Sequence, residues 1–350
     1  MNQINQMSRD AFGPICLEPI CQYRLWGGRR LGEINRAFLR DDLVGEVWLL
    51  SDREDFANRV KNGKFKGVTF GEVFQTKQEE LMGKFRNRYP RFPLLLKFLD
   101  ARGTISVQVH PTCANLEYLK KGERSKTEAW ITIESGAESC IYAGVKAGTT
   151  KNDLRKALKE RRLTDYLCKF QGKPGAAFFL PAGTVHSLVD TVVFEVQENS
   201  DTTFRLYDWD RIDAKTGLPR ELQIEEALIC ANLTQTEAGL QVPIVEASFP
   251  VVRERVFDCK NFLLWRHSGK RPFTVGVAEE PRVLVNIKGS GSVLKEGKRY
   301  AIEKGEVIVL PAAIGECVLE PSNEIIILEI GLPDRVDNCH KQNSNRFHSP

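Results

Sequence analysis

Four side chains, in three separate segments of the sequence, are of the types that bind a catalytic metal ion. Gln108 and His110 lie two residues apart after an apolar run, and residues i and i+2 of a β-strand point to the same face. Such a strand would direct an amide oxygen and an imidazole into one cavity, which is half of a metal site. Glu128 and His186 are candidates for the other half. Together they form a suitable set for a catalytic Zn²⁺, because such sites leave room for water or substrate.

Each of these residues also has a structural interpretation. A single buried histidine is more often a satisfied core residue than a ligand, and most glutamates lie at the surface. The chain has only five histidines, and two of them, His340 and His348, lie in its polar C-terminal segment. An amide two residues before His110 and a second histidine at a strand start favour ligands. Glu128 precedes the apolar residues 129–133, where an inward carboxylate needs a cation.

Three cationic residues lie near these segments. Lys97 interrupts an apolar run, and from the sequence alone it is expected to extend outward to solvent rather than to hold an anion. Lys126 precedes Glu128 by two residues and shares its face if the segment is extended. Arg205 follows a strand within an Asp-rich segment, so it either pairs with a neighbouring aspartate or forms a fixed cation at the rim of the metal cavity.

Composition excludes several classes of protein. A chain of 350 residues, 42% hydrophobic and 27% charged, is typical of a globular protein of about two domains. The net charge of +4 is too small to indicate a nucleic-acid partner, and no apolar run is long enough to span a membrane. A polar N-terminus argues against a secretory signal. Nine cysteines without a CxxC pair favour reduced thiols in a cytoplasmic protein. Phosphate-loop, dinucleotide-binding and serine-hydrolase motifs are absent.

The elements that position these residues are mostly short strands. Helices are expected over 70–88, over 151–170 with Thr149 or Thr150 as the cap, and over 221–233. Short β-branched or aromatic runs broken by Gly and Pro predict antiparallel β-barrels. The expected strands include 130–133, 176–180, 191–197, 282–287, 307–310 and 324–330.

One internal repeat is visible. Residues 174–182 align with 304–312, and in each a glycine turn leads into an apolar strand that ends at Pro-Ala. The same offset puts Glu316 in the position of His186, and the second copy has no Gln-x-His strand. The alternative is chance recurrence of a common β pattern. The identities favour a duplicated β unit that retains its metal in the first half only.

Taken in order, these motifs resemble type I mannose-6-phosphate isomerases, most closely the short bacterial form. The resemblance runs from about residue 12 to about residue 332. It is carried by Gln108 with His110, by Lys126-Thr-Glu128, by Leu180–His186, by Asn199–Arg211, and by Leu25–Gly28, Gly45–Trp48, Phe92–Lys97 and Arg220–Leu222.

The resemblance implies a mainly β fold of two cupin (jelly-roll) β-barrels with a few added helices. The expected domains are 1–235, catalytic with helical insertions, and 236–335, a degenerate cupin without metal ligands, followed by a polar tail, 336–350. It also implies one Zn²⁺ per chain, and the reversible isomerisation of D-mannose 6-phosphate and D-fructose 6-phosphate. The family's zinc ligands fall on Gln108, His110, Glu128 and His186.

The resemblance also assigns residues to the reaction. The essential arginine falls on Arg205, with Glu195 nearby; the active-site lysines are Lys97 and Lys126, and Ser106 is beside them. Proton transfer between C1 and C2 through a cis-enediol(ate) needs a base. Glu195, Lys126 and a zinc-bound water all remain candidates for that base. The phosphate could be held by Ser106, a lysine or Arg211. The expected partner is a small sugar phosphate, with no nucleic acid or membrane, and the oligomeric state stays unassigned.

Two alternative functions, from other classes of protein, are less well supported by the sequence. A non-catalytic sugar-binding cupin would be expected to have lost ligands or Arg205, and neither is lost. A cupin-type Fe(II) oxygenase would use two histidines and a carboxylate, whereas the added Gln108 and the flanking cations favour a sugar phosphate.

Overall fold

The computed structural model describes residues 12–118, 123–234 and 236–335, which fold into two compact units. The first unit comprises residues 19–51 and 93–242, and the second comprises 12–18, 52–92 and 243–335. The expected boundary after residue 235 lies near the observed break after Val242. Residues 12–18 and 52–92, however, were expected in the N-terminal domain and belong to the second unit. A strand of the first range pairs with the C-terminal segment, and Lys61 and Lys84 of the second range form ion pairs with Glu306 and Glu280. The expected polar tail, 336–350, lies outside the described residues.

The first unit is built on a ten-stranded antiparallel sheet. Its main path runs in the order β11 (Gly239–Gln241), β8 (Ala177–Leu180), β6 (Glu128–Val145), β9 (His186–Glu198), β4 (Leu94–Thr104), β3 (Val44–Leu50) and β2 (Ile20–Gly28). Three shorter strands attach to this path, namely β5 (Val107–Val109), β7 (Leu167–Phe170) and β10 (Phe204–Tyr207). The central strands β4 and β9 are almost entirely buried, as expected for long apolar, β-branched runs.

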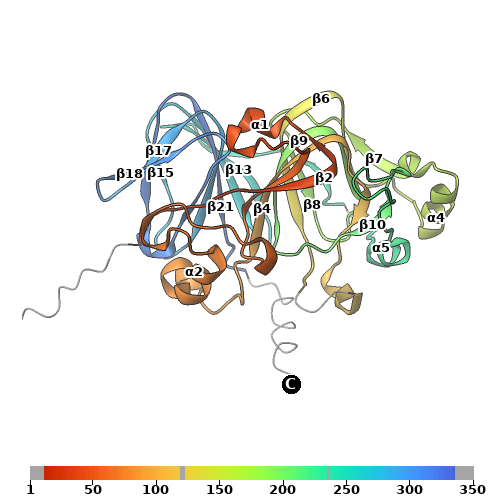
Figure 1. Ribbon diagram of the computed structural model, residues 1–350, viewed down its shortest axis with the longest axis horizontal. Helices are drawn as coiled ribbons and strands as arrows, with labels where there is room; N and C mark the ends of the chain where they lie inside the picture. The colour runs from red at the N-terminus through yellow and green to blue at the C-terminus, as the bar shows by residue number, and fades with distance from the viewer. Residues whose placement is uncertain (1–11, 119–122, 235, 336–350) are drawn as a thin grey trace, which may run out of the picture. The chain divides into compact units, whose positions relative to one another are not determined.

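Helices cover one part of this sheet. The short helix α1 (Leu31–Ile34) follows β2, and α4 (Lys151–Lys159) and α5 (Ile224–Cys230) lie near β7 and β10 in Figure 1. Leu154 of α4 and Leu228 of α5 share one apolar core with Val109 of β5 and Leu206 of β10. This core fixes β5 and β10, the two short strands that carry Gln108 and Arg205.

The second unit is a sandwich of two antiparallel sheets. The larger sheet has the order β1 (Ile15–Cys16), β19 (Val307–Leu310), β16 (Arg282–Lys288), β21 (Ile325–Gly331), β14 (Leu263–Gly269), β13 (Val252–Asp258) and β12 (Ile244–Ala247). The smaller has the order β15 (Phe273–Val275), β20 (Cys317–Pro321), β17 (Gly291–Lys295) and β18 (Lys298–Ile302). One buried core contains residues of both sheets, such as Ile327 and Leu319. The helices α2 (Phe70–Thr76) and α3 (Gln78–Met82) also belong to this unit.

The mainly β fold and all six expected strands are confirmed. The sheets are open rather than closed barrels, so the architecture is a cupin-like β-sandwich. The helix expected over 151–170 is wrong in its second half: α4 ends at Lys159, Arg161 adopts a positive φ of 57°, and 167–170 form strand β7. Thr150 is the cap, through a capping box with Asp153.

The other two helices are confirmed in shorter form. The pattern over 70–88 folds as α2 and α3, interrupted at Lys77, and the pattern over 221–233 folds as α5. The two copies of the repeat fold as β8 and β19, which occupy the same place in their respective sheets.

The described part of the chain contains no helix that is long and apolar enough to cross a membrane. Cys113 is disulfide-bonded, so the expectation of reduced thiols fails at that residue. Seven cysteines of the described residues are free. The free cysteines are Cys16, Cys21, Cys140, Cys168, Cys230, Cys259 and Cys317.

Candidate metal centre and its cavity

The sheet of the first unit brings the predicted ligands together by strand register. Gln108 on β5 pairs directly with His186 at the start of β9. Glu128 is the first residue of β6, which also pairs with β9. His110 follows β5 by one residue, so one short strand supplies two of the four predicted ligands.

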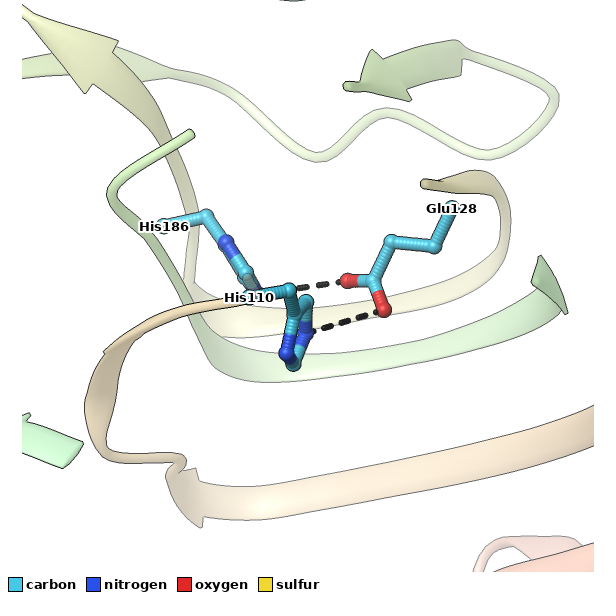
Figure 2. A group of neighbouring side chains, drawn as sticks. All are labelled: His110, Glu128 and His186. Atoms are coloured by element: carbon cyan, nitrogen blue, oxygen red, sulfur yellow. Dashed lines mark ion pairs between the residues drawn. The ribbon is translucent and has the colours of Figure 1, made fainter. Parts of the chain in front are cut away.

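His110, Glu128 and His186 form a buried cluster, in which the exposed fractions are 2%, 0% and 1% (Figure 2). The Nε2 atom of His110 lies 3.1 Å from Oε2 of Glu128, and Nε2 of His186 lies 3.2 Å from Oε1. The Nδ1 atoms lie 3.0 and 2.8 Å from the carbonyl oxygens of Thr202 and Thr184. A carbonyl only accepts, so each Nδ1 carries a hydrogen, and the Nε2 atoms are the ring nitrogens that face the carboxylate.

The ionisation states of His110 and Glu128 determine what this cluster can bind. Burial, with the positive charge of Lys126, lowers the pKa of His110 to about 3, so this imidazole is neutral. Burial opposes ionisation of Glu128 as well, but the positive charge of Lys126 holds its pKa well below the ordinary range. Both carboxylate oxygens are buried, and Oε2 is paired with Lys126. Two imidazole nitrogens that converge on an ionised carboxylate in a dry site fit a bound cation.

Gln108 and Lys126 complete the surroundings of the cluster. The Nε2 atom of Gln108 lies 3.1 Å from Nε2 of His186, and its Oε1 accepts a hydrogen bond of 3.1 Å from Ser106. The amide oxygen and nitrogen have nearly the same shape, so a half-turn of the amide presents the oxygen to the cluster. Lys126 Nζ lies 2.8 Å from Oε2 of Glu128. Burial disfavours the charge of Lys126, but Glu128 and Glu195 raise its pKa, so it stays a cation.

A cavity of about 310 Å³ opens beside the cluster, and the first unit alone forms it. Most of its lining residues are polar or charged, which suits a hydrophilic ligand rather than an apolar one. They are Tyr23, Arg24, Leu25, Trp26, Glu46, Lys97, Leu99, Ile105, Gln108, Lys126, Glu195, Asp201, Thr203, Arg205, Asp213 and Arg220.

Lys97 and Glu195 occupy the same row of the sheet, because they pair directly across β4 and β9. Lys97 is 3% exposed, and its Nζ lies 3.6 to 3.8 Å from carboxylate oxygens of Glu46, Asp201 and Glu195. The expectation that Lys97 extends to solvent is therefore wrong. The indole of Trp130 donates a hydrogen bond of 2.8 Å to Oε2 of Glu195. Burial raises the pKa of Glu195, and the nearby charge of Glu128 adds to this effect.

Arg205 pairs in register with Gln108, which brings it next to the cluster. Its side chain forms no hydrogen bond or ion pair with any residue that the structure describes, and its Nε is buried without a partner. Burial lowers the pKa of Arg205, and the charge of Arg220 contributes. The alternative of pairing with a neighbouring aspartate does not occur, since Asp208 is bonded to Arg211 and Arg220 instead.

Of the three residues predicted to bind substrate, Lys97 lines the cavity, whereas Ser106 and Arg211 do not. Ser106 is buried and hydrogen-bonded to Gln108. Arg211 donates to Asp208 and to the carbonyl oxygen of Thr104. Arg24 and Arg220, which the sequence motifs did not single out as functional, do line it.

Arg24 and Arg220 each form a bidentate pair with a carboxylate. Arg24 donates to both oxygens of Glu46, at 2.9 and 3.0 Å, and Arg220 donates to both oxygens of Asp208. The sequence carried one usable signal for the first pair: Glu46 lies inside the apolar strand 44–50, just as Lys97 lies inside β4.

Comparison with known proteins places this site in a family. Residues 16–135 match the family described as phosphomannose isomerase type I, catalytic domain. The chain is 32% identical to the mannose-6-phosphate isomerase ManA of Bacillus subtilis over 326 residues, which cover 90% of this chain and 98% of that protein. It is also 32% identical to a mannose-6-phosphate isomerase of Streptococcus mutans, over 89% of this chain and 97% of that one. The crystal structure of a mannose 6-phosphate isomerase from Bacillus subtilis matches with a TM-score of 0.84 at 28% identity, over 92% of this chain and all of that one. The chain belongs to the type I mannose-6-phosphate isomerases, a family of enzymes.

Proposed function

We propose that this enzyme catalyses the reversible isomerisation of D-mannose 6-phosphate and D-fructose 6-phosphate through a cis-enediol(ate). One observation carries the proposal: the unpaired guanidinium of Arg205 lines a cavity beside a buried His-Glu-His cluster suited to a cation, and Gln108 and Lys126, which contact that cluster, line the same cavity. Aldose–ketose isomerisation moves a proton between C1 and C2, and negative charge develops on the sugar oxygens. A site for this reaction therefore needs fixed positive charge where those oxygens lie.

We propose that His110, Glu128 and His186 hold one Zn²⁺ per chain, with the amide oxygen of Gln108 as a fourth ligand. The donor set supports zinc, because it combines neutral imidazoles with one carboxylate. The backbone carbonyls behind His110 and His186 fix both tautomers with Nε2 toward the ion. When bound, the ion would act as a Lewis acid toward the oxygens at C1 and C2.

The residues of the cavity wall would divide the remaining work. Arg205 forms no ion pair that would have to break, so its guanidinium is free to stabilise the charge of the enediolate. Glu195 is our candidate for the base that moves the proton. The hydrogen bond from Trp130 fixes one of its oxygens, and the other lies near Lys97. Lys126 is bonded to Glu128 as a cation, which favours an electrostatic role over that of a base.

The phosphate would lie at the part of the cavity lined by Arg24 and Arg220. Guanidinium groups bind phosphate in a bidentate manner, and the pairs with Glu46 and Asp208 hold both groups in place. Arg211 would act indirectly, by holding Asp208. Ser106 would also act indirectly, by holding the side-chain amide of Gln108 through a hydrogen bond.

The test is to incubate purified protein with mannose 6-phosphate and to follow fructose 6-phosphate, with and without a chelator, before zinc is added back. Turnover should disappear with the metal and return with zinc, at one ion per chain. In D₂O, deuterium should appear at C1 of the product, as an enediol requires. A folded, zinc-loaded protein without turnover would overturn the proposed reaction, and turnover that survives complete metal removal would overturn the proposed site.

Two variants, one at the candidate metal site and one matched control, test the role of the metal. His186→Gln should lose the ion and turnover, whereas His267→Gln alters a buried histidine of the second unit and should retain both. Because sugar phosphates are charged and stay inside cells, we also expect the enzyme in the cytoplasm, which cell fractionation would check.

A further inference from the structure

The two large sheets share one pairing register, so positions of the first can be matched to positions of the second. Strand pairs correspond in order along both sheets. The matching pairs are Glu128–Leu180 with Arg282–Leu310, Trp130–Glu195 with Leu284–Glu329, Lys97–Glu195 with Trp265–Glu329, and Glu46–Leu99 with Arg253–His267. The second sheet therefore keeps one carboxylate, Glu329, in the place of Glu195.

The other matched positions have changed charge. Arg282 replaces the candidate metal ligand Glu128, and its guanidinium contacts Glu280 at 2.6 Å and Glu329 at 3.7 Å. A buried arginine thus takes the place that a metal ion would need. Arg253 likewise replaces a carboxylate, Glu46, of the first cavity. These replacements make the second sheet suited to an anion rather than to a cation.

The second unit nevertheless has a cavity at the matching place. Its volume is about 410 Å³, and its wall includes Arg253 and His267, which match the wall residues Glu46 and Leu99 of the first cavity. Most of the wall is apolar. The lining residues are Ala247, Phe249, Pro250, Val251, Arg253, His267, Pro272, Phe273, Thr274 and Val318.

The polar group at the base of this cavity is His267, which is 3% exposed. Its Nε2 lies 2.9 Å from Oε2 of Glu329, and the ring stacks on Phe273 at 5.2 Å between centroids and 16° between planes. Because Glu329 is a carboxylate that accepts this hydrogen bond, Nε2 carries the hydrogen and Nδ1 is the ring nitrogen left for a ligand. Nδ1 has no hydrogen-bond partner in the described part of the chain, so it is open to the hydroxyl group of a ligand.

One arginine, Arg253, lines the cavity. It pairs in register with His267, and its Nε is buried without a hydrogen bond, 3.4 Å from Oε2 of Glu246. Glu246 also contacts Arg255, which has a second carboxylate partner in Asp258 at 2.8 Å. Arg271 lies over the ring of the wall residue Phe249, which is itself 72% exposed. The cavity thus combines a guanidinium whose Nε has no hydrogen bond with aromatic walls.

We propose that this second cavity binds a small aromatic carboxylic acid with a hydroxyl group on its ring. The carboxylate would pair with Arg253, the ring would pack between Phe249 and Phe273, and the hydroxyl would form a hydrogen bond with Nδ1 of His267. A sugar phosphate fits poorly, because the lining residues include no carboxylate or amide to bind several sugar hydroxyls. This site is separate from the proposed isomerase site and does not depend on it.

The test uses 4-hydroxyphenylacetate as the probe and tyramine as its counterpart, which has the same phenol ring and a cationic tail. Binding to the zinc-loaded enzyme is measured by saturation-transfer NMR and titration calorimetry. We expect the acid to bind at least tenfold more tightly than tyramine, and an excess of mannose 6-phosphate to leave the binding unchanged. Equal binding of the two compounds, no binding of the acid at about 10 mM, or displacement by mannose 6-phosphate would overturn the proposal.

Three variants locate the site. Arg253→Gln and His267→Phe should each weaken binding of the acid about tenfold. Val318→Glu adds a negative charge at an exposed position of the wall, where the fold tolerates it, and should weaken binding at least as much. Isomerase activity should stay within twofold of the unaltered enzyme in the Val318→Glu variant. Unchanged affinity in a folded Val318→Glu protein would overturn the proposal even if the other two variants do not fold.

Discussion

Replacement of Arg205 by alanine should separate the contribution of this residue to catalysis from its contribution to stability. The guanidinium forms no hydrogen bond or ion pair within the described residues, and its Nε is buried. It pairs in register with Gln108, so the two Cβ atoms are about 5 Å apart. Removing one preorganised donor from such a site lowers kcat by about 10²–10³, which is about 3–4 kcal/mol of transition-state stabilisation.

The same replacement should not weaken the fold. An unpaired buried charge is unfavourable, so the free energy of unfolding of Arg205→Ala should be unchanged or higher by about 1 kcal/mol. The assays are steady-state isomerisation of mannose 6-phosphate, metal content and urea unfolding. We expect zinc at one per chain and kcat reduced at least a hundredfold, with Arg205→Lys only partly active. Turnover near that of the unaltered enzyme, or loss of zinc together with stability, would refute this reasoning.

Three further predictions follow from the contacts described above. Glu195→Gln should lower kcat by at least 10²-fold, whereas Glu329→Gln, the matched buried carboxylate of the second sheet, should leave kcat nearly unchanged; equal losses would remove Glu195 from the reaction. Arg220→Ala should raise KM for the sugar phosphate more than Arg211→Ala does, because only Arg220 lines the cavity; the reverse order in steady-state kinetics would contradict the phosphate assignment. Burial opposes ionisation of Glu329, but the hydrogen bond from His267 holds its pKa below the ordinary range. Ionised Glu329 therefore adds to the free energy of unfolding above about pH 4.3, and this contribution is lost as the pH falls through the lower pKa of the folded state. Glu329→Gln should flatten the acid side of the plot of unfolding free energy against pH. Parallel plots for the two proteins, measured by urea unfolding, would contradict this.

The ligand set could be predicted because its signal is local. Gln108 and His110 are two apart on one strand, and period-two alternation alone puts both on one face. Glu128 stood out as a charge at the start of an apolar strand. The same rule would have found Glu46, a carboxylate inside a fully buried strand, and it should have assigned Lys97 to the cavity rather than to solvent.

The rest of the site depends on non-local pairing. Arg220 and Arg211 both lie in polar segments outside the strands, and only the folded structure distinguishes the one that lines the cavity from the one that binds a carbonyl. The grouping of 12–18 with the C-terminal segment depends on a two-residue strand, Ile15–Cys16, which pairs with β19. No periodicity can identify so short a strand. The end of α4 depended on a positive φ at Arg161, which is not a glycine.

An exchange of the charges at residues 126 and 128 tests two ideas together: the register match between the two sheets, and the origin of the candidate metal site. Lys126 and Glu128 pair at 2.8 Å just before and at the start of β6, and Glu280 and Arg282 pair at 2.6 Å at the same place before β16, with the signs reversed. Glu128→Arg alone leaves Lys126 beside a second cation and should destabilise the first unit. The double change Lys126→Glu with Glu128→Arg recreates the pair of the second sheet, so the two changes should couple by about 1–3 kcal/mol in urea unfolding of the metal-free proteins. Both variants that carry Glu128→Arg should bind no zinc and show no turnover. Additive effects on stability would mean that the two sheets share a register without sharing the energetics of this pair.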